Sequence, residues 1–213
     1  MEADDRAAGL LLAAGAGVRL GTPKALVGVG GEPLVVRGAR TLAAAGCRPC
    51  VVVAGARADD VQTQVDIADL PADADVRVIV APEWASGQAH SLRAGLEHLG
   101  QVAAPAVVVA LVDQPLVTPA AIERLVLAWR SGAQSAVSTY DGQRRPPVLL
   151  DAQVWPEVTA ALHGDDGAGP WLEANAHRTT GVEVGDVADG RDVDTPEELA
   201  AVNLMVVGRR PWP

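Results

Sequence analysis

A segment near the N-terminus combines residue types suited to binding a polyanion. An apolar run over residues 9–14 leads directly into a loop, residues 15–24, that contains three glycines together with Arg19 and Lys24. Glycine lets backbone N–H groups approach a phosphate without a Cβ in the way, and it reaches conformations closed to other residues. The two cations add positive charge where a triphosphate carries most of its negative charge. The sequence therefore predicts a nucleotide-phosphate site at the carboxyl end of a first β-strand.

Two familiar glycine-rich phosphate loops do not match this segment. A P-loop requires a Ser or Thr hydroxyl directly after its lysine, whereas Ala25 follows Lys24. The dinucleotide motif Gly-x-Gly-x-x-Gly needs its third glycine one residue before Gly21, and it opens a helix that Pro23 disfavours. From residue types alone, the remaining alternative is a glycine-rich turn with two solvated cations.

Carboxylates follow two other predicted elements. Asp113 comes just after the apolar run over residues 106–111, and Asp192 and Asp194 lie on the extended lead-in to a helix that Thr195 caps. Two carboxylates facing a triphosphate suit Mg²⁺, a hard cation that takes oxygen ligands and keeps several waters. A turn aspartate and a helix cap are the alternatives. The co-occurrence of these carboxylates with the glycine-rich loop favours a metal site.

Alternating apolar runs and amphipathic segments predict the elements that would position these residues. Strands are expected at residues 8–13, 50–54, 76–81, 106–111 and 135–139. Helices are expected at residues 34–45, 58–67, 87–99, 119–129, 152–162 and 196–204. This alternation is typical of βαβ units and predicts an α/β fold, a single-domain, Rossmann-like, mostly parallel sheet flanked by helices. The domain would span residues 8–204, between an N-terminal tail (1–7) and a C-terminal tail (205–213).

Ligands of doubly wound sheets bind beyond the carboxyl ends of the strands, so the segments that directly follow strands are the first candidates for ligand-binding residues. Gly55 directly follows the second predicted strand, although a plain turn glycine is the simpler interpretation. Residues 141–147 are expected to form a turn between two extended segments, and residues 164–170 a mobile loop.

Composition limits the partners and the compartment. A length of 213 residues suits one α/β domain, and a net charge of −10 without a basic stripe argues against a nucleic-acid surface. No apolar stretch is long enough to span a membrane, and the acidic start lacks the layout of a signal peptide. We therefore expect a cytoplasmic protein without membrane association. Cys47 and Cys50 form a Cys-x-x-Cys pair, but they precede a strand instead of opening a helix, which disfavours a redox role.

Together these motifs resemble the MobA-like nucleotidyltransferases, and within them the molybdenum cofactor cytidylyltransferases. The matching residues run in family order over about residues 8–204: Leu12-Ala13-Ala14-Gly15, Arg19-Leu20-Gly21, Pro23-Lys24, Gly31–Leu34, Ala81–Gly87, Ser91–Leu96, Val112–Val117, Pro146–Leu150 and Asp192–Leu199. The resemblance implies the fold of the nucleotide-diphospho-sugar transferases. It also implies transfer of a nucleotidyl group from a nucleoside triphosphate to a phosphorylated acceptor, with release of pyrophosphate. Such a reaction depends mainly on positioning and charge neutralisation.

The resemblance assigns roles to residues of this chain. The nucleotide would be bound by Leu12, Ala13, Ala14, Gly15, Ala16, Gly17, Arg19, Lys24, Gly55, Gly87 and Ser91. Arg19, Lys24 and Asp113 would be the catalytic residues, the two cations by neutralising the phosphates. Asp113 and one of Asp192 and Asp194 would bind Mg²⁺, and Asp192 is favoured because it lies farther from the helix cap.

The nucleotide and the acceptor follow from smaller features of the match. Guanylyl-transferring relatives have Gly where this chain has Ala14, and the added methyl narrows the pocket against a purine, which favours CTP. The cation that relatives often carry after a Gly-Asp-x-Gly-Ala stretch is replaced here by Gly169, so Arg144 or Arg145 would meet the acceptor phosphate. The expected acceptor is molybdopterin, and a transient contact with a molybdoenzyme is a further partner to consider.

Three alternatives remain beside this hypothesis. The acceptor could be another phosphorylated small molecule. Some members of the family resemble nicotine blue reductases, which would make the chain an NAD(P)H-dependent oxidoreductase on the same fold. The chain could also be an inactive binding module that partners molybdoenzymes. Retention of both Lys24 and Asp113 favours nucleotidyl transfer, since a reductase needs no magnesium at an α-phosphate.

Overall fold

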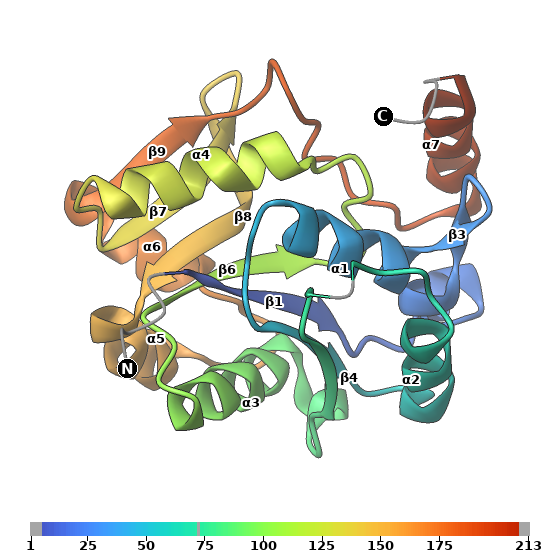
Figure 1. Ribbon diagram of the computed structural model, residues 1–213, viewed down its shortest axis with the longest axis horizontal. Helices are drawn as coiled ribbons and strands as arrows, with labels where there is room; N and C mark the ends of the chain where they lie inside the picture. Colours follow the sequence, from blue (N-terminus) through green and yellow to red (C-terminus); the bar gives the residue numbers. More distant parts are fainter. Residues whose placement is uncertain (1–5, 72, 209–213) are drawn as a thin grey trace.

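A seven-stranded sheet forms the middle layer of the molecule, with helices on both of its faces (Figure 1). The computed structural model describes residues 6–71 and 73–208. The strands lie in the order β5 (Val76–Val80), β4 (Cys50–Ala54), β1 (Ala8–Ala13), β6 (Ala106–Leu111), β8 (Gln143–Asp151), β7 (Ser135–Tyr140) and β9 (Thr179–Glu183). Neighbouring strands are parallel except where β8 pairs with β6 and β7. The single-domain, Rossmann-like α/β fold expected from the sequence is confirmed.

The central strand β1 is apolar along its whole length because both of its faces are covered. Leu10 and Leu12 pack into the core on one side of the sheet, whereas Leu11 and Ala13 pack into the core on the other side. Such two-sided burial explains an uninterrupted apolar run, since alternate side chains of a strand point to opposite faces. β1 pairs in parallel with both β4 and β6, so the segments that follow these three strands emerge at one edge of the sheet.

Two helical layers enclose the sheet. The first layer contains α1 (Leu34–Ala44), α2 (Ala58–Asp66) and α4 (Pro119–Arg130). The second contains α3 (Gln88–Gln101), α5 (Trp155–Ala161) and α6 (Gly169–Ala174). The last helix, α7 (Pro196–Gly208), lies beside the small hairpin of β2 (Gly28–Val29) and β3 (Glu32–Pro33), away from the sheet (Figure 1). Among the described residues, no helix has the length and apolar character needed to cross a membrane.

Most elements agree with the sequence-based expectation, and the differences cluster in the second half. The five expected strands are present, and the expected helices are present with small shifts at their ends. The segment 152–162 divides into a 3₁₀ turn (Ala152–Val154) and α5, and α7 continues to Gly208 instead of ending at residue 204. The tail residues 1–5 and 209–213 lie outside the described residues.

The turn expected over residues 141–147 does join two extended segments, β7 and β8, but it is limited to residues 141–142, because β8 begins at Gln143. Arg144 and Arg145 therefore lie on a strand, opposite Thr139 and Ser138 of β7. A bulge takes up the two prolines that follow, which cannot donate ladder hydrogen bonds and so hide the strand in the sequence. The loop expected over residues 164–170 is also shorter, because α6 begins at Gly169.

The two cysteines belong to the core of the first helical layer. Cys47 and Cys50 are buried and free, and the Cys50 thiol donates a hydrogen bond to the Cys47 carbonyl. Burial raises the pKa of Cys50 to about 12 and raises the pKa of Cys47 as well. Both thiols therefore stay protonated at neutral pH, and a protonated buried thiol is a poor nucleophile.

Candidate active site

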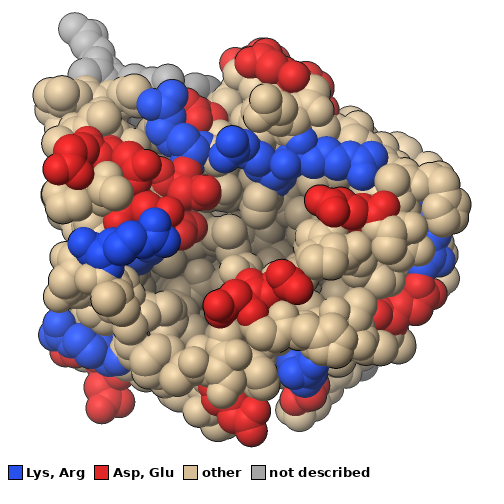
Figure 2. Space-filling view, turned by 180° about the vertical axis from the view of Figure 1, so that it is seen from behind, with Lys and Arg blue, Asp and Glu red and all other residues tan. Residues whose placement is uncertain are grey.

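A cavity of about 300 Å³ opens at the carboxyl ends of β1 and β6. Its lining consists of Leu12, Ala14, Gly15, Ala16, Gly17, Lys24, Trp84, Ala85, Gly87, Gln88, Ser91, Leu111, Val112, Asp113 and Asp165. Of the residues predicted to bind the nucleotide, Ala13, Arg19 and Gly55 lie outside this lining, and the others are part of it. On the face seen in Figure 2 the surface is hollowed, and both basic and acidic side chains stand around the hollow.

The glycine-rich loop is held in place by its own backbone. Gly17 adopts a left-handed conformation, with φ of 63°, and a Cβ there would lie 1.8 Å from the Thr22 carbonyl oxygen. Only glycine allows this close return of the chain. A Cβ on Gly15, in contrast, would meet nothing within 4 Å, so its backbone borders open space in the cavity. The fold of the loop thus exposes backbone to the cavity and brings Lys24 back toward the sheet.

Lys24, the only lysine of the chain, connects two segments that carry carboxylates. Its Nζ lies 2.6 Å from Asp113 Oδ2 and is also ion-paired with Asp194 Oδ1. Arg19, whose side chain is largely exposed, lies with Nη1 3.2 Å from Asp194 Oδ2. Burial lowers the pKa of Lys24, but its hydrogen bonds to Asp113 and Asp194 outweigh burial and the net shift is upward. The hydrogen bond from Lys24 lowers the pKa of Asp194 in turn.

Asp192 lies in a different electrostatic setting from Asp194. Its Oδ1 accepts a hydrogen bond of 2.9 Å from Gln114 Nε2. Burial raises the pKa of Asp192, and the negative charge of Asp113 adds to this rise, although the Gln114 hydrogen bond and the charge of Arg145 oppose it. The Asp192 carboxylate therefore lacks the direct neutralisation that Lys24 and Arg19 give to Asp194.

Asp113 lines the cavity, whereas Asp192 and Asp194 lie outside its lining, close to Asp113 and Lys24 respectively. Asp113 and Asp192 together have the chemistry of a two-carboxylate metal site. Asp113 Oδ1 is buried and has no hydrogen-bond partner among the described residues. A buried carboxylate oxygen without a partner is costly, and an oxygen-seeking divalent cation would satisfy it. The described chain has no cluster of three or more His, Cys, Asp or Glu side chains that could hold a metal. A metal here would thus take Asp113 and Asp192 as protein ligands, with phosphate and water completing its shell, as Mg²⁺ commonly does.

Another part of the cavity wall is formed by the start of α3 and the segment before it. Ser91 is buried on α3, and Gly87 caps this helix with φ of 118°. A Cβ on Gly87 would lie 2.2 Å from the Gly164 carbonyl oxygen, so this glycine permits the contact between α3 and the loop before α6. The same loop places Asp165 on the cavity lining.

Trp84 is a lining residue to which the sequence assigned no role. Its ring packs against Gly55, where a Cβ would lie 2.4 Å from Trp84 Cγ and 2.7 Å from the Ala14 carbonyl oxygen. Gly55 therefore lies behind Trp84 instead of on the cavity surface. The position of Trp84 within the matched segment 81–87, a few residues after a strand, was the signal that could have identified it.

Arg144 and Arg145 lie outside the cavity lining. Both are exposed on β8, and the positive charge of Arg145 acts on Asp192 and on Tyr140. Arg145 is therefore near the carboxylate side of the site.

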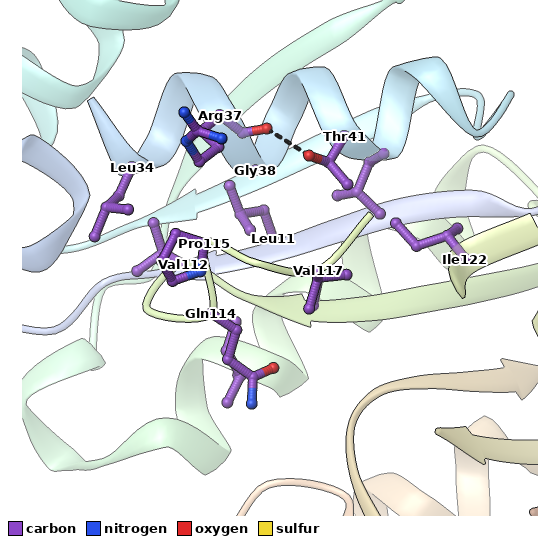
Figure 3. A pocket seen from close by; sticks show the side chains of 13 residues that line it. Leu11, Leu34, Arg37, Gly38, Thr41, Val112, Gln114, Pro115, Val117 and Ile122 are labelled. Atoms are coloured by element: carbon purple, nitrogen blue, oxygen red, sulfur yellow. Dashed lines mark hydrogen bonds between the residues drawn. The ribbon is translucent and has the colours of Figure 1, made fainter. Parts of the chain in front are cut away.

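A second, much smaller cavity of about 20 Å³ lies behind the turn that carries Asp113 (Figure 3). It is enclosed by α1 on one side, including Arg37, and by the turn with Gln114 and Pro115 on the other. This volume is close to the space that one water molecule needs. This cavity is therefore too small for a nucleotide.

Comparison with known proteins identifies the family. Residues 9–180 match the MobA-like NTP transferase domain. The chain belongs to this family. The match confirms that the sequence motifs are those of the MobA-like nucleotidyltransferases.

Several relatives match this MobA-like chain over most of its length. Nicotine blue oxidoreductase of Paenarthrobacter nicotinovorans is 35% identical over 201 residues, which cover 90% of this chain and 93% of that protein. The crystal structure of the Rv0371c homolog from Mycobacterium sp. strain JC1 matches with a TM-score of 0.76 and 29% identity, covering 96% of this chain and 98% of that one. Rv0371c of Mycobacterium tuberculosis in complex with manganese matches with a TM-score of 0.70 and 26% identity, covering 93% and 98%.

Proposed function

We propose that this protein transfers CMP from CTP to the phosphate of molybdopterin, with release of pyrophosphate and with Mg²⁺ as its metal. The observation that carries the proposal is the ion pair between Lys24 and Asp113, which both line the cavity together with the glycine-rich loop. A cation for phosphates and a carboxylate with an unpaired buried oxygen lie side by side there. Nucleotidyl transfer needs both groups, and membership in the MobA-like family supports the same chemistry.

The proposed reaction is an in-line displacement at the α-phosphorus. An oxygen of the acceptor phosphate forms a bond to this phosphorus, the bond to the oxygen bridging the α- and β-phosphates breaks, and pyrophosphate leaves. Backbone groups of the loop at Gly15 and the cation of Arg19 would bind the β- and γ-phosphates, and Lys24 would stabilise charge at the α-phosphate. A magnesium ion held by Asp113 and Asp192 would neutralise the phosphate oxygens.

The walls of the cavity support a pyrimidine nucleotide. Ala14 and Ser91 both line the cavity. In this proposal the methyl group of Ala14 narrows the base pocket against a purine, and the hydroxyl of Ser91 recognises a base edge. The acceptor phosphate would approach from the side of β8, because Arg144 and Arg145 offer positive charge there. Asp165, which lines the cavity itself, would repel a phosphate.

A second candidate function is that of an NAD(P)H-dependent oxidoreductase of the nicotine-blue-reductase type. It is favoured by the 35% identity to nicotine blue oxidoreductase over nearly the full length of both chains. Hydride transfer, however, gives no role to a lysine–aspartate pair or to a partnerless carboxylate oxygen. These residues favour the transferase proposal over the reductase.

The shift in melting temperature caused by CTP, GTP or NADPH, each with and without Mg²⁺, tests the proposal. A ligand that binds the folded state stabilises it by an amount that grows with the logarithm of the ratio of ligand concentration to dissociation constant, and so raises the melting temperature. We expect the largest shift for CTP with Mg²⁺, and loss of the metal-dependent part of it in Asp113→Asn. Asp59→Asn, on the exposed surface of α2, is the matched control. A shift with NADPH alone that is independent of metal and unchanged in Asp113→Asn would instead support the reductase.

A further inference from the structure

Gln114 links the two chain segments that carry the carboxylates of the site. It follows Asp113 in the turn after β6 and is buried, with 6% of its surface exposed. Its side-chain Nε2 donates hydrogen bonds to the Gly190 carbonyl oxygen, at 3.1 Å, and to Asp192 Oδ1, at 2.9 Å. A single amide group thus connects the turn to residues 190–192, which are distant in the sequence.

The chemistry of the partners fixes the orientation of this amide. A backbone carbonyl and a carboxylate are both acceptors, so only the NH₂ end of Gln114 can face them. A third hydrogen bond, from Val193 N to the Asp113 carbonyl oxygen at 2.8 Å, runs between the same two segments. The three bonds hold Asp192 beside Asp113, where the two negative charges repel each other.

The other end of the amide is left without a partner. Gln114 Oε1 is buried and makes no hydrogen bond to any described residue. In Figure 3 the Gln114 side chain extends away from α1, so Arg37, which also has an unpaired buried Nε, lies on the other side of the turn. The contribution of Gln114 therefore lies in its two donated hydrogen bonds.

We infer that Gln114 is a positioning residue for the metal site, which holds the Asp192 carboxylate beside Asp113 so that both can bind one divalent cation. Gln114 contacts Asp192 and not the metal. The inference rests on the proposed function, because it requires that Asp113 and Asp192 bind a metal. Partners behind metal ligands commonly change metal affinity by about 10–100-fold when they are replaced.

The dissociation constant of Mn²⁺, measured by calorimetry on the full chain, tests this inference. Gln114→Met removes both donors without adding a charge, and Gln114→Glu places a carboxylate of nearly the same shape against two acceptors. We expect Mn²⁺ affinity to fall about tenfold in Gln114→Met and further in Gln114→Glu. Gln134→Glu, the same exchange at an exposed position, should leave the Mn²⁺ affinity unchanged. Melting temperatures measured in parallel identify a variant that fails to fold.

A double-mutant cycle with Asp192→Asn separates positioning from a general structural effect. If Gln114 acts through Asp192, Gln114→Met should not lower Mn²⁺ affinity any further once Asp192 has become Asn. Fully additive effects, or unchanged Mn²⁺ affinity in Gln114→Met, would overturn the inference while leaving the proposed function standing. A wild-type protein that binds no Mn²⁺, alone or with CTP, would overturn both.

Discussion

Lys24 Nζ lies 2.6 Å from Asp113 Oδ2, although 89 positions separate the two residues. Without ligand, the ammonium group of Lys24, which suits a phosphate, and the carboxylate of Asp113, which suits a metal, neutralise each other. A triphosphate would compete for Lys24 and release Asp113 to bind a metal, and a metal would in turn release Lys24 to the phosphates. Nucleotide and metal should therefore bind with positive coupling, which is reciprocal by thermodynamic necessity.

This coupling predicts the effect of removing the lysine charge. In Lys24→Met, the transfer rate should fall by about 10²–10³-fold, the loss typical of removing one group that stabilises developing charge. The coupling should also shrink, so that CTP tightens Mn²⁺ binding less than it does in the wild type. Titration of Mn²⁺ with and without CTP measures this effect. Arg191→Met, which removes an exposed cation paired with Asp189, is the control and should retain the coupling.

The pKa of Lys24 can be measured directly because the chain has no other lysine. Reductive ¹³C-methylation followed by NMR should give a single lysine side-chain signal that titrates above the value of a methylated lysine in an unfolded peptide. Although burial lowers this pKa, the hydrogen bonds to Asp113 and Asp194 raise it more. Asp113→Asn should lower the pKa of Lys24, and an unchanged value would contradict the ion pair.

The same shift makes a prediction about stability at high pH. The pKa of Lys24 is higher in the folded state than in the unfolded state. Its contribution to the free energy of unfolding is therefore fully present below its unfolded-state pKa of about 10.4, and it is lost as the pH rises through its folded-state pKa. Wild type should therefore lose more stability than Lys24→Met between about pH 10 and the folded-state pKa. Urea unfolding at a series of pH values measures the difference, and parallel curves for the two proteins would contradict it.

Asp192→Asn should stabilise the metal-free protein and weaken its binding of metal. The pKa of Asp192 is raised by burial and then by the charge of Asp113, so its ionised form is disfavoured in the folded state. Its contribution to stability is greatest below the unfolded value of about 3.9 and falls as the pH rises through the folded value. The gain from Asn should therefore appear at neutral pH and vanish in acid. Melting temperatures at neutral pH and at pH 4 without metal provide the test, and destabilisation at neutral pH would refute this account.

Gly55→Ala should displace Trp84, which lines the cavity. The new Cβ would lie 2.4 Å from Trp84 Cγ and 2.7 Å from the Ala14 carbonyl oxygen, and the latter is backbone that cannot rotate away. We expect a loss of about 1–3 kcal/mol in stability, as for other overpacked sites. CTP binding should weaken as well, because Trp84 lines the cavity. Gly100→Ala in α3, where a Cβ meets nothing within 4 Å, is the control and should not destabilise the protein.

Ala14→Gly tests the choice of nucleotide. Ala14 lines the cavity and is buried, so removal of its methyl should make room for a purine. We expect the preference for CTP over GTP, as the ratio of kcat/KM values, to fall about tenfold, the usual effect of one methyl in a pocket. An unchanged ratio would show that another part of the site selects the base.

The sequence predicted β1, β4 and β6 because these strands are buried on both faces and are therefore uninterrupted in their apolar character. It missed the first part of β8, where arginines and prolines obscure the strand, and it missed β9, which consists mainly of Thr, Gly and Glu at the sheet edge. The same logic holds at the site. The carboxyl ends of β1 and β6 predicted that the glycine-rich loop and Asp113 would be near each other. Two contacts could not be predicted in this way, namely the ion pair of Lys24 with Asp194 and the hydrogen bond from Gln114 to Asp192. Both depend on the path of the segment before α7 past the turn that follows β6, and no local sequence pattern determines that path.

The most direct test of metal-dependent nucleotidyl transfer is turnover of CTP labelled at its α-phosphate, with molybdopterin as acceptor. In the presence of Mg²⁺, labelled CMP should appear on the acceptor in an amount equal to the pyrophosphate released. This transfer should disappear without Mg²⁺ and in Asp113→Asn, and it should persist in Asp59→Asn. Absence of transfer to molybdopterin, together with metal-independent oxidation of NADPH that survives Asp113→Asn, would contradict the account.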